Sequence, residues 1–349
     1  MKSSNIADSV FKVNLKYVEL QNETKELFFR CLNENKDISY FSDQIREIWG
    51  NLDYSFMQDE ITEYEALIHE RNVEGKEITE VSKQGDIFDL VPLAVIIGIE
   101  RKFVKQKEKE YKSSHKYVNK IETDIKNATS ETYKEIKKEQ KQEYLKLKVQ
   151  RYTNQIVPYY SQSTGKKIRD VELSTYCSMI HNTNLTRAGW NQTLKDAEQI
   201  NYNYFVIPYH PFSCEHCIDH QNRVMTRQQV INLIGVAEEK EGDILHPNCK
   251  CVLVAIKNYN DIDKIESPFR YSLTREEKIN ISNIRQKTNS LTLQKEKIKT
   301  DMKIQKSLGN QDEVDKLNQQ RNKINKTIRD LKEELPTTSL KKQLTAINR

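Results

Sequence analysis

The fold of the central part of this chain is decided by two short stretches, Cys214-Glu-His216-Cys217 and His246-Pro-Asn-Cys249-Lys-Cys251. They hold four of the six cysteines of the chain. A C-x-x-C turn can place two sulfurs on one metal ion, and a second pair arriving from a distant segment can close a tetrahedral shell. The two stretches therefore predict a zinc site that staples a small module, whose few strands would bury little apolar surface without it.

The preferred ligands are Cys214, Cys217, His246 and Cys249, and Cys251 is an alternative to His246. Because four Cys or His ligands fill the coordination shell, the pattern is typical of a closed structural zinc site rather than a catalytic one. The alternative is that these are buried thiols acting as small apolar side chains. The neighbouring histidines are spare ligands or could orient a ligand from outside the shell: His210, His216 and His220.

Motifs of enzymes are absent or incomplete. A zinc deaminase pairs H-x-E with P-C-x-x-C, whereas here Pro211 stands three residues before Cys214 and His181-Asn-Thr lacks the glutamate. The chain has no H-E-x-x-H and no glycine-rich phosphate loop. We therefore expect no enzymatic activity. A zinc-dependent nuclease or toxin-like enzyme acting on nucleic acid is the first alternative.

The composition favours long, solvated helices. Of 349 residues, 36% are hydrophobic and 31% charged, with only 9 Gly. We predict an α+β, mainly α-helical fold in which long helices flank the zinc-stapled module and a helical hairpin or coiled coil follows it. The expected division is an acidic helical domain over 1–100, a basic long-helix region over 101–169, the cysteine/histidine module over 170–260 and a C-terminal hairpin with a tail over 261–349.

Charge is distributed unevenly along the chain. Residues 1–100 carry 10 Lys/Arg and 20 Asp/Glu, whereas residues 101–151 carry 16 and 8. A basic helix after an acidic head suggests partners of both signs, although solvated helical faces are the plainer interpretation. Tyr111, Tyr117 and Tyr133 interleave with the lysines and are expected in the core rather than as base-stacking platforms. The candidate contacts to nucleic-acid phosphates are Lys102, Lys105, Lys109, Lys112, Lys116 and Lys120.

Apolar periodicity places the elements. Strands alternate with a short helix in the module, and Gly309 marks the turn of the last hairpin. Cys31 and Cys177 stand alone in helical stretches and are expected in the core. Helices are predicted over 18–32, 45–57, 61–68, 171–197, 226–233 and 272–336, with one or two across 101–151 and an interruption over 155–165. Strands are predicted over 202–207, 223–225 and 251–256.

No membrane span is expected. The longest apolar run, 90–99, is much shorter than the roughly 20 residues that a spanning helix needs. It should form a buried helix or strand with Pro92 near its start, or, as a lesser alternative, meet a membrane only after a conformational change. The first residues do not form a secretory signal, so reduced cysteines are expected, which favours metal over disulfide.

The order of motifs resembles the phage minor head proteins, namely the Mu F-like head morphogenesis and minor capsid protein 2 family. The resemblance covers 170–256, where a helix and a strand precede C-x-x-C, then His220-Gln-Asn-Arg223-Val, then His246-Pro-Asn-Cys249-Lys-Cys251 and a last strand. The helix resembles the family's R-T-E-x-x-R-A-x-N helix. It departs from that pattern at His181-Asn182-Thr183-Asn184, where Arg and Glu are usual, and Asn222 replaces a usual glycine.

The resemblance implies a minor capsid protein present in few copies inside the head near the portal, with roles in head assembly, DNA packaging or ejection. Its implied partners are the portal protein, the major capsid or scaffold protein and packaged double-stranded DNA, and the helices suggest self-association. The implied localisation is the virion, after assembly in the host cytoplasm. A DNA-binding regulatory protein with a zinc module is the second alternative.

Overall fold

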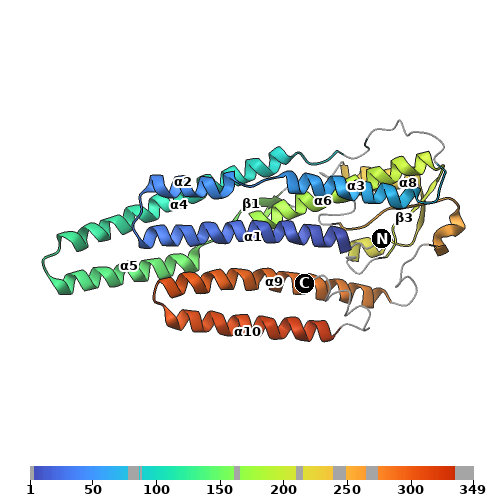
Figure 1. Ribbon diagram of the computed structural model, residues 1–349. Coiled ribbons are helices and arrows are strands. Elements are labelled where there is room, and N and C mark those ends of the chain that lie inside the picture. Colours follow the sequence, from blue (N-terminus) through green and yellow to red (C-terminus); the bar gives the residue numbers. More distant parts are fainter. Residues whose placement is uncertain are drawn as a thin grey trace.

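The computed structural model describes residues 4–77, 86, 89–160, 166–209, 215–238, 249–264 and 274–334. Within them the protein is elongated, and its long helices run roughly along one axis (Figure 1). A small sheet lies near one end of that axis, and the turn of a helical hairpin forms the other. The predicted fold class is confirmed: the structure is mainly α-helical, with a small α+β module and a C-terminal helical hairpin.

The first three helices are α1 (Ser4–Asn33), α2 (Ile38–Gly50) and α3 (Ser55–Val73). The predicted helix over 45–57 is therefore wrong, because the chain breaks between α2 and α3. The carboxylate of Asp53 accepts hydrogen bonds from the backbone N–H and the hydroxyl of Ser55, both at 2.8 Å. Such local side-chain bonds compete with helix formation and favour a new start at Ser55.

A long hairpin follows, formed by α4 (Leu93–Asn127) and α5 (Glu131–Arg151). It confirms the expectation of one or two helices across 101–151, with two present, and α4 starts directly after Pro92, whose fixed φ suits a helix start. The hydroxyl of Ser130 accepts from the backbone N–H of Tyr133 and caps α5. The single helix α4 runs across the expected boundary at residue 100, and the division into domains stays a prediction.

Aromatic side chains fill the core between these helices. Phe28 lies edge-to-face against Phe41 and Tyr111, with ring centroids 5.7 and 5.5 Å apart. Trp49 packs on Phe103 at 5.0 Å. All five side chains are buried, so the helical body has a large apolar core of its own.

A β-hairpin precedes a helix of 27 residues, most of which are buried. β1 (Gln155–Tyr160) pairs antiparallel with β2 (Lys167–Glu172), and α6 (Leu173–Gln199) follows at once. The sequence predicted only an interruption here, because Pro158 cannot donate to a ladder. A two-stranded ribbon consists of edge strands, where proline is tolerated.

The module continues with three short strands in the order β4-β3-β5, both pairs antiparallel. They are β3 (Tyr204–Val206), β4 (Val224–Thr226) and β5 (Val254–Ile256). The three predicted strands are present: β3 and β5 are shorter than predicted, and β4 is shifted by one residue. The short helices around them are α7 (Glu215–Ile218), α8 (Arg227–Glu238) and the 3-10 helix η1 (Tyr259–Lys264).

The last hairpin is formed by α9 (Arg275–Ser307) and α10 (Gln311–Glu333), and α9 packs against α1. Thr274 and Glu277 form a capping box at the start of α9. Gly309 has φ +68° in the turn, a left-handed conformation that favours glycine. Among the described residues no helix has the length and apolarity required to cross a membrane.

Candidate metal centre

Three cysteines converge in the module. The sulfur atoms of Cys217, Cys249 and Cys251 all lie within 4.8 Å of one another, and the three side chains are buried. Cys217 comes from α7, and the other two come from the extended segment that leads into β5. The three cysteines lie close enough to bind one metal ion.

The spacing suits thiolate ligands. The Sγ atoms of Cys217 and Cys249 are 3.8 Å apart. Two sulfurs that each lie about 2.3 Å from a tetrahedral zinc are themselves separated by roughly 3.8 Å, whereas a disulfide needs about 2.05 Å. The donor set and its spacing therefore fit a metal that prefers sulfur.

The other predicted ligands fall in different places. Cys214, His246 and the spare histidine His210 lie outside the described residues, as does the side chain of His216. His220 stands in the turn after α7 and does not belong to the sulfur group. Cys251 and His246 were the alternative ligands in the second stretch. Cys251 belongs to the described sulfur group, whereas His246 lies outside the described residues.

Helix α6 positions the segment that carries Cys249 and Cys251. Asn182 Nδ2 and Thr186 Oγ1 both donate to the carbonyl oxygen of Cys249, at 2.7 and 2.9 Å. One turn further, Trp190 Nε1 donates to the carbonyl oxygen of Cys251 at 2.8 Å. These buried bonds fix the backbone on both sides of Lys250 and so fix where the two sulfurs point.

The same row of contacts extends to Leu253. Its carbonyl oxygen accepts from Thr193 Oγ1 and from Arg71 Nη2, both at 3.3 Å. Residues 182, 186, 190 and 193 follow one another at intervals of four, four and three, so they share one face of α6. Alternate carbonyls of an extended chain also point to one side, which is why one helix face can hold 249, 251 and 253.

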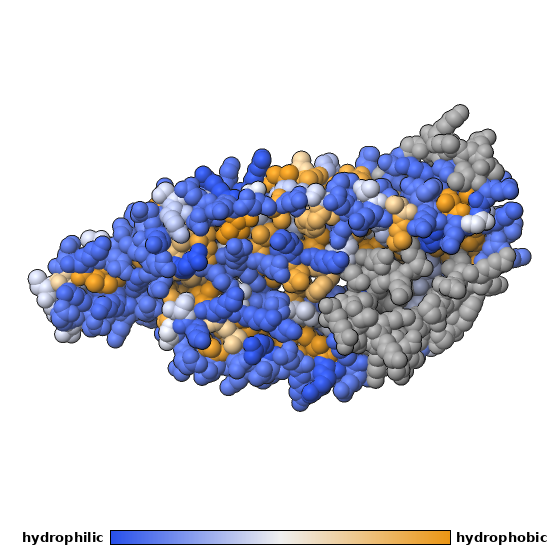
Figure 2. Space-filling model, viewed as in Figure 1, coloured by the Kyte–Doolittle hydropathy of each residue, from blue (hydrophilic) through white to orange (hydrophobic). Residues whose placement is uncertain are grey.

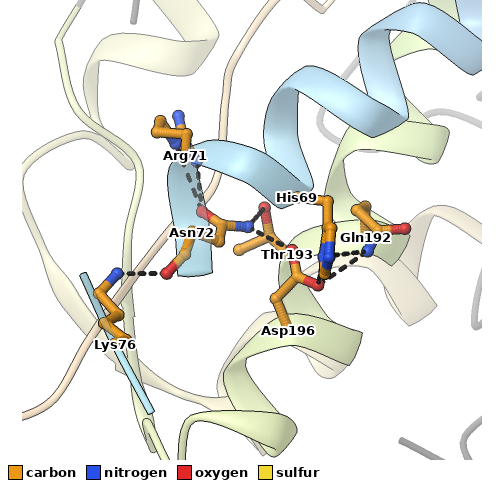
Figure 3. A network of polar contacts seen from close by, with 7 residues as sticks. All are labelled: His69, Arg71, Asn72, Lys76, Gln192, Thr193 and Asp196. Atoms are coloured by element: carbon orange, nitrogen blue, oxygen red, sulfur yellow. Dashed lines mark hydrogen bonds and ion pairs between the residues drawn. The ribbon is translucent and has the colours of Figure 1, made fainter. Parts of the chain in front are cut away.

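A buried polar network joins α3 to this face of α6 (Figure 3). Asp196 is fully buried, and its carboxylate accepts from Asn72 Nδ2 at 2.9 Å and from Gln192 Nε2 at 2.8 Å. His69 Nδ1 lies 2.7 Å from the same carboxylate. Arg71, whose pKa burial lowers, donates in turn to Asn72 Oδ1 at 2.9 Å. The network ties α3, α6 and Leu253 into one support.

Sequence reasoning missed this support entirely. It identified the cysteines by type and spacing, but Asn182, Thr186, Trp190 and Thr193 carry no motif. Their three- and four-residue spacing was the available signal, and it becomes meaningful only once the partner segment is known. Asn182 also belongs to the four residues that depart from the minor head protein pattern, and here it holds the cysteine backbone.

His181 makes a second polar contact, on the other side of α6. Its Nε2 lies 2.8 Å from Ser9 Oγ and 3.0 Å from Glu60 Oε2, and Ser9 Oγ also donates to Glu60. A Ser-His-acid triad needs the acid at Nδ1, opposite the serine. Here both partners meet Nε2, and Nδ1 has no hydrogen-bond partner among the described residues, so the geometry is not that of a triad.

The six lysines proposed for nucleic acid lie exposed along one face of α4. Within the described part of the chain none of them forms an ion pair, so their charges face solvent. Tyr111 is buried, as expected, but Tyr117 and Tyr133 are exposed, which corrects the expectation that all three pack in the core.

Cys31 and Cys177 are buried in the helical core, and burial raises the pKa of the Cys31 thiol to about 11.

Comparison of the chain with protein-family models, with curated proteins and with solved structures found no significant match.

Proposed function

We propose that the chain is a minor head protein of a tailed bacteriophage, located inside the head near the portal, where it acts in head assembly, DNA packaging or ejection. The observation that carries the proposal is the convergence of Cys217, Cys249 and Cys251. These residues come from the two stretches that resemble the family, and their closeness agrees with the stretches forming one unit. The elongated helical body agrees with an assembly role.

The metal in this proposal is zinc with a structural role. Its ligands are Cys217, Cys249 and Cys251, with Cys214 as the fourth because C-x-x-C supplies two sulfurs from one turn. His246 is the competing fourth ligand. A closed shell of four such groups leaves no position for a reactive water, so the zinc would cross-link the module and not catalyse a reaction.

The zinc proposal is tested on the purified full-length chain by metal analysis. We expect close to one zinc per chain, and its loss in Cys217→Ser/Cys249→Ser. Cys214→Ser should also lose it, whereas His246→Ala should retain it; the reverse pattern would assign His246 as the fourth ligand. The matched control is Cys31→Ser, which changes a core thiol far from the group. A chain purified without metal and indifferent to these changes would rule out the zinc.

The proposed partners are the portal protein, the major capsid or scaffold protein and packaged double-stranded DNA. The exposed lysines of α4 supply the charge for DNA, and contacts to phosphates need no base reading. Binding of this kind weakens steeply with salt. Reversing Lys105, Lys109 and Lys112 to Glu should therefore reduce duplex binding equally for unrelated sequences.

The head role is tested by sedimenting phage particles and procapsids from a lysate of the strain that encodes the chain and analysing them by mass spectrometry. Presence at a low ratio to the major capsid protein, together with portal protein, is the expected result. Absence from particles and procapsids alike would overturn the head role and leave the cysteine group as a metal module of another protein class.

A further inference from the structure

An open groove of about 1030 Å³ runs between α1 and the α2–α3 segment. Its lining includes the apolar side chains of Leu20, Leu27, Leu52 and Phe56, of which the three leucines are buried and Phe56 is half-buried. Grooves with an apolar floor between helices are typical sites for one face of an added amphipathic helix.

The rim of this groove is acidic. Six Asp/Glu and three Lys/Arg line it. Glu19, Glu23, Glu47 and Asp53 are exposed, and in the described part of the structure none of the four forms an ion pair with Lys, Arg or His. The groove therefore combines apolar contact area with unneutralised negative charge, and its occupant should be basic and amphipathic.

A surface of that kind is present on the α4–α5 hairpin of the same molecule. The α4–α5 hairpin extends past the ends of α1 and α2 (Figure 1), and apolar atoms are visible near its end among hydrophilic ones (Figure 2). Tyr117, Tyr133, Ile136 and Leu147 are between 39% and 55% exposed on it.

Positive charge accompanies these exposed side chains. Residues 101–151 carry a balance of +8, and Lys116 and Lys120 flank Tyr117 along α4 without ion-pair partners among the described residues. Tyr117 itself packs on Tyr144 of α5 with ring centroids 4.4 Å apart, so the two helices present one continuous face. This hairpin face is basic and carries exposed apolar side chains, so it is complementary to the acidic groove with its apolar floor.

The hairpin face cannot enter the groove of its own chain, because Tyr111, Val118 and Leu145 anchor the hairpin in the core and its turn projects past the ends of α1 and α2. We propose that the α4–α5 hairpin of one copy docks into the acidic groove of a second copy. The contact joins two different surfaces, so each copy keeps one of each available, and successive copies form a ring or an open chain. The inference requires neither the metal nor the head role.

The test is sedimentation velocity of the full-length chain over a range of concentrations at low salt. We expect concentration-dependent association that weakens as salt screens the charges. Glu19→Lys/Glu23→Lys in the groove and Lys116→Glu/Lys120→Glu on the hairpin should each weaken association by about tenfold or more, because like charges then face one another. Combining all four changes should restore it, since the charge pairs are then exchanged.

The matched control reverses two exposed lysines elsewhere, Lys323→Glu/Lys326→Glu on α10, and should leave association unchanged. Circular dichroism and zinc content verify that each variant is folded. A chain that stays monomeric at every concentration would overturn the proposal, as would reversals without effect or a combined variant that fails to associate. Association with the expected pattern in a protein absent from phage particles would refute the head role alone.

Discussion

The helical body and the cysteine module are stabilised in different ways. In the body, helices of 13 to 35 residues enclose an aromatic core around Phe28. In the module, three strands of three residues each pack on α6, and the cysteines themselves belong to the small apolar cluster around Trp190. The body resembles an ordinary globular core, whereas the module is too small to rely on apolar burial alone.

The difference shows where specific residues matter most. In the body many apolar side chains share the same task, so the position of one helix does not depend on one contact. In the module the segment 249–253 is held by a few named donors, Asn182, Thr186 and Trp190, and by the sulfur group. Each region also contains one of the two tryptophans, Trp49 in the body and Trp190 in the module. Replacing one of them by Phe leaves a single fluorescent reporter, so the unfolding of the two regions can be followed separately.

The largest effect is expected from Cys217→Ser/Cys249→Ser. If the proposed zinc cross-links the module, its loss removes a contribution on the order of 10 kcal/mol to local folding. Hydrogen exchange should then show the amides of β3 and β5 unprotected while those of α1 and α4 keep their protection. Equal protection of the module in the variant and in the parent chain would show that the apolar cluster is sufficient.

A second change addresses the body. Phe28→Ala removes a buried ring that contacts Phe41 and Tyr111, and should lower the free energy of unfolding by about 3–5 kcal/mol. Denaturation followed at Trp49 should shift, while zinc content stays unchanged. A loss of zinc in this variant would mean that the two regions unfold as one unit.

A smaller effect is expected within the row of donors on α6. Thr186→Val keeps the side-chain shape but removes one of the two hydrogen bonds to the carbonyl of Cys249, so about 1 kcal/mol of module stability should be lost. Denaturation followed at Trp190 measures it. The control is Thr183→Val on the same helix, whose hydroxyl, among the residues that the structure describes, donates only to the carbonyl oxygen of Met179 in that helix. Equal shifts in the two variants would contradict a special role of Thr186.

The smallest effect concerns the pH dependence of the body. Burial raises the pKa of Glu100, although the hydroxyls of Tyr17 and Tyr54 donate to its carboxylate. The folded chain therefore keeps this proton to a higher pH than the unfolded chain, whose carboxyl titrates near about 4.3. The free energy of unfolding should fall as pH rises from there through the folded pKa.

Glu100→Gln should remove that fall, because the amide does not titrate. Urea denaturation followed at Trp49 between about pH 4 and pH 8 compares the two profiles, and the difference between them isolates this carboxyl from other titrating groups. Parallel profiles would show that the polar surroundings of Glu100 offset its burial.

The sequence was a good guide wherever a signal was local. The long helices of 101–151, the final hairpin with Gly309 and the strands around the cysteines all follow from periodicity and turn residues. The break between α2 and α3 at 51–54 was not predicted, because apolar residues on both sides continue at helical spacing. The β1–β2 ribbon was not predicted because a proline normally argues against a strand. That Pro158 lies in an edge strand, where proline is tolerated, could not be known from the sequence.

The residues of the candidate site, too, could be predicted only where their signal was local. Residue type and spacing singled out Cys217, Cys249 and Cys251, because thiols in pairs are chemically distinctive. The donors on α6 are ordinary polar residues, and their role depends on a segment about sixty residues away in the chain. Exposure of Tyr117 and Tyr133 was equally hidden, since a helix pattern does not reveal where its covering neighbours end.

The length of α4 has a mechanical consequence. At 1.5 Å per residue, its 35 residues extend about 52 Å from Pro92. Along most of that length Ile96, Phe103, Tyr111 and Val118 anchor the helix in the core, so it acts as a strut that carries the hairpin turn away from the body. The reach of the molecule is therefore set by how these four side chains pack between the helices of the body.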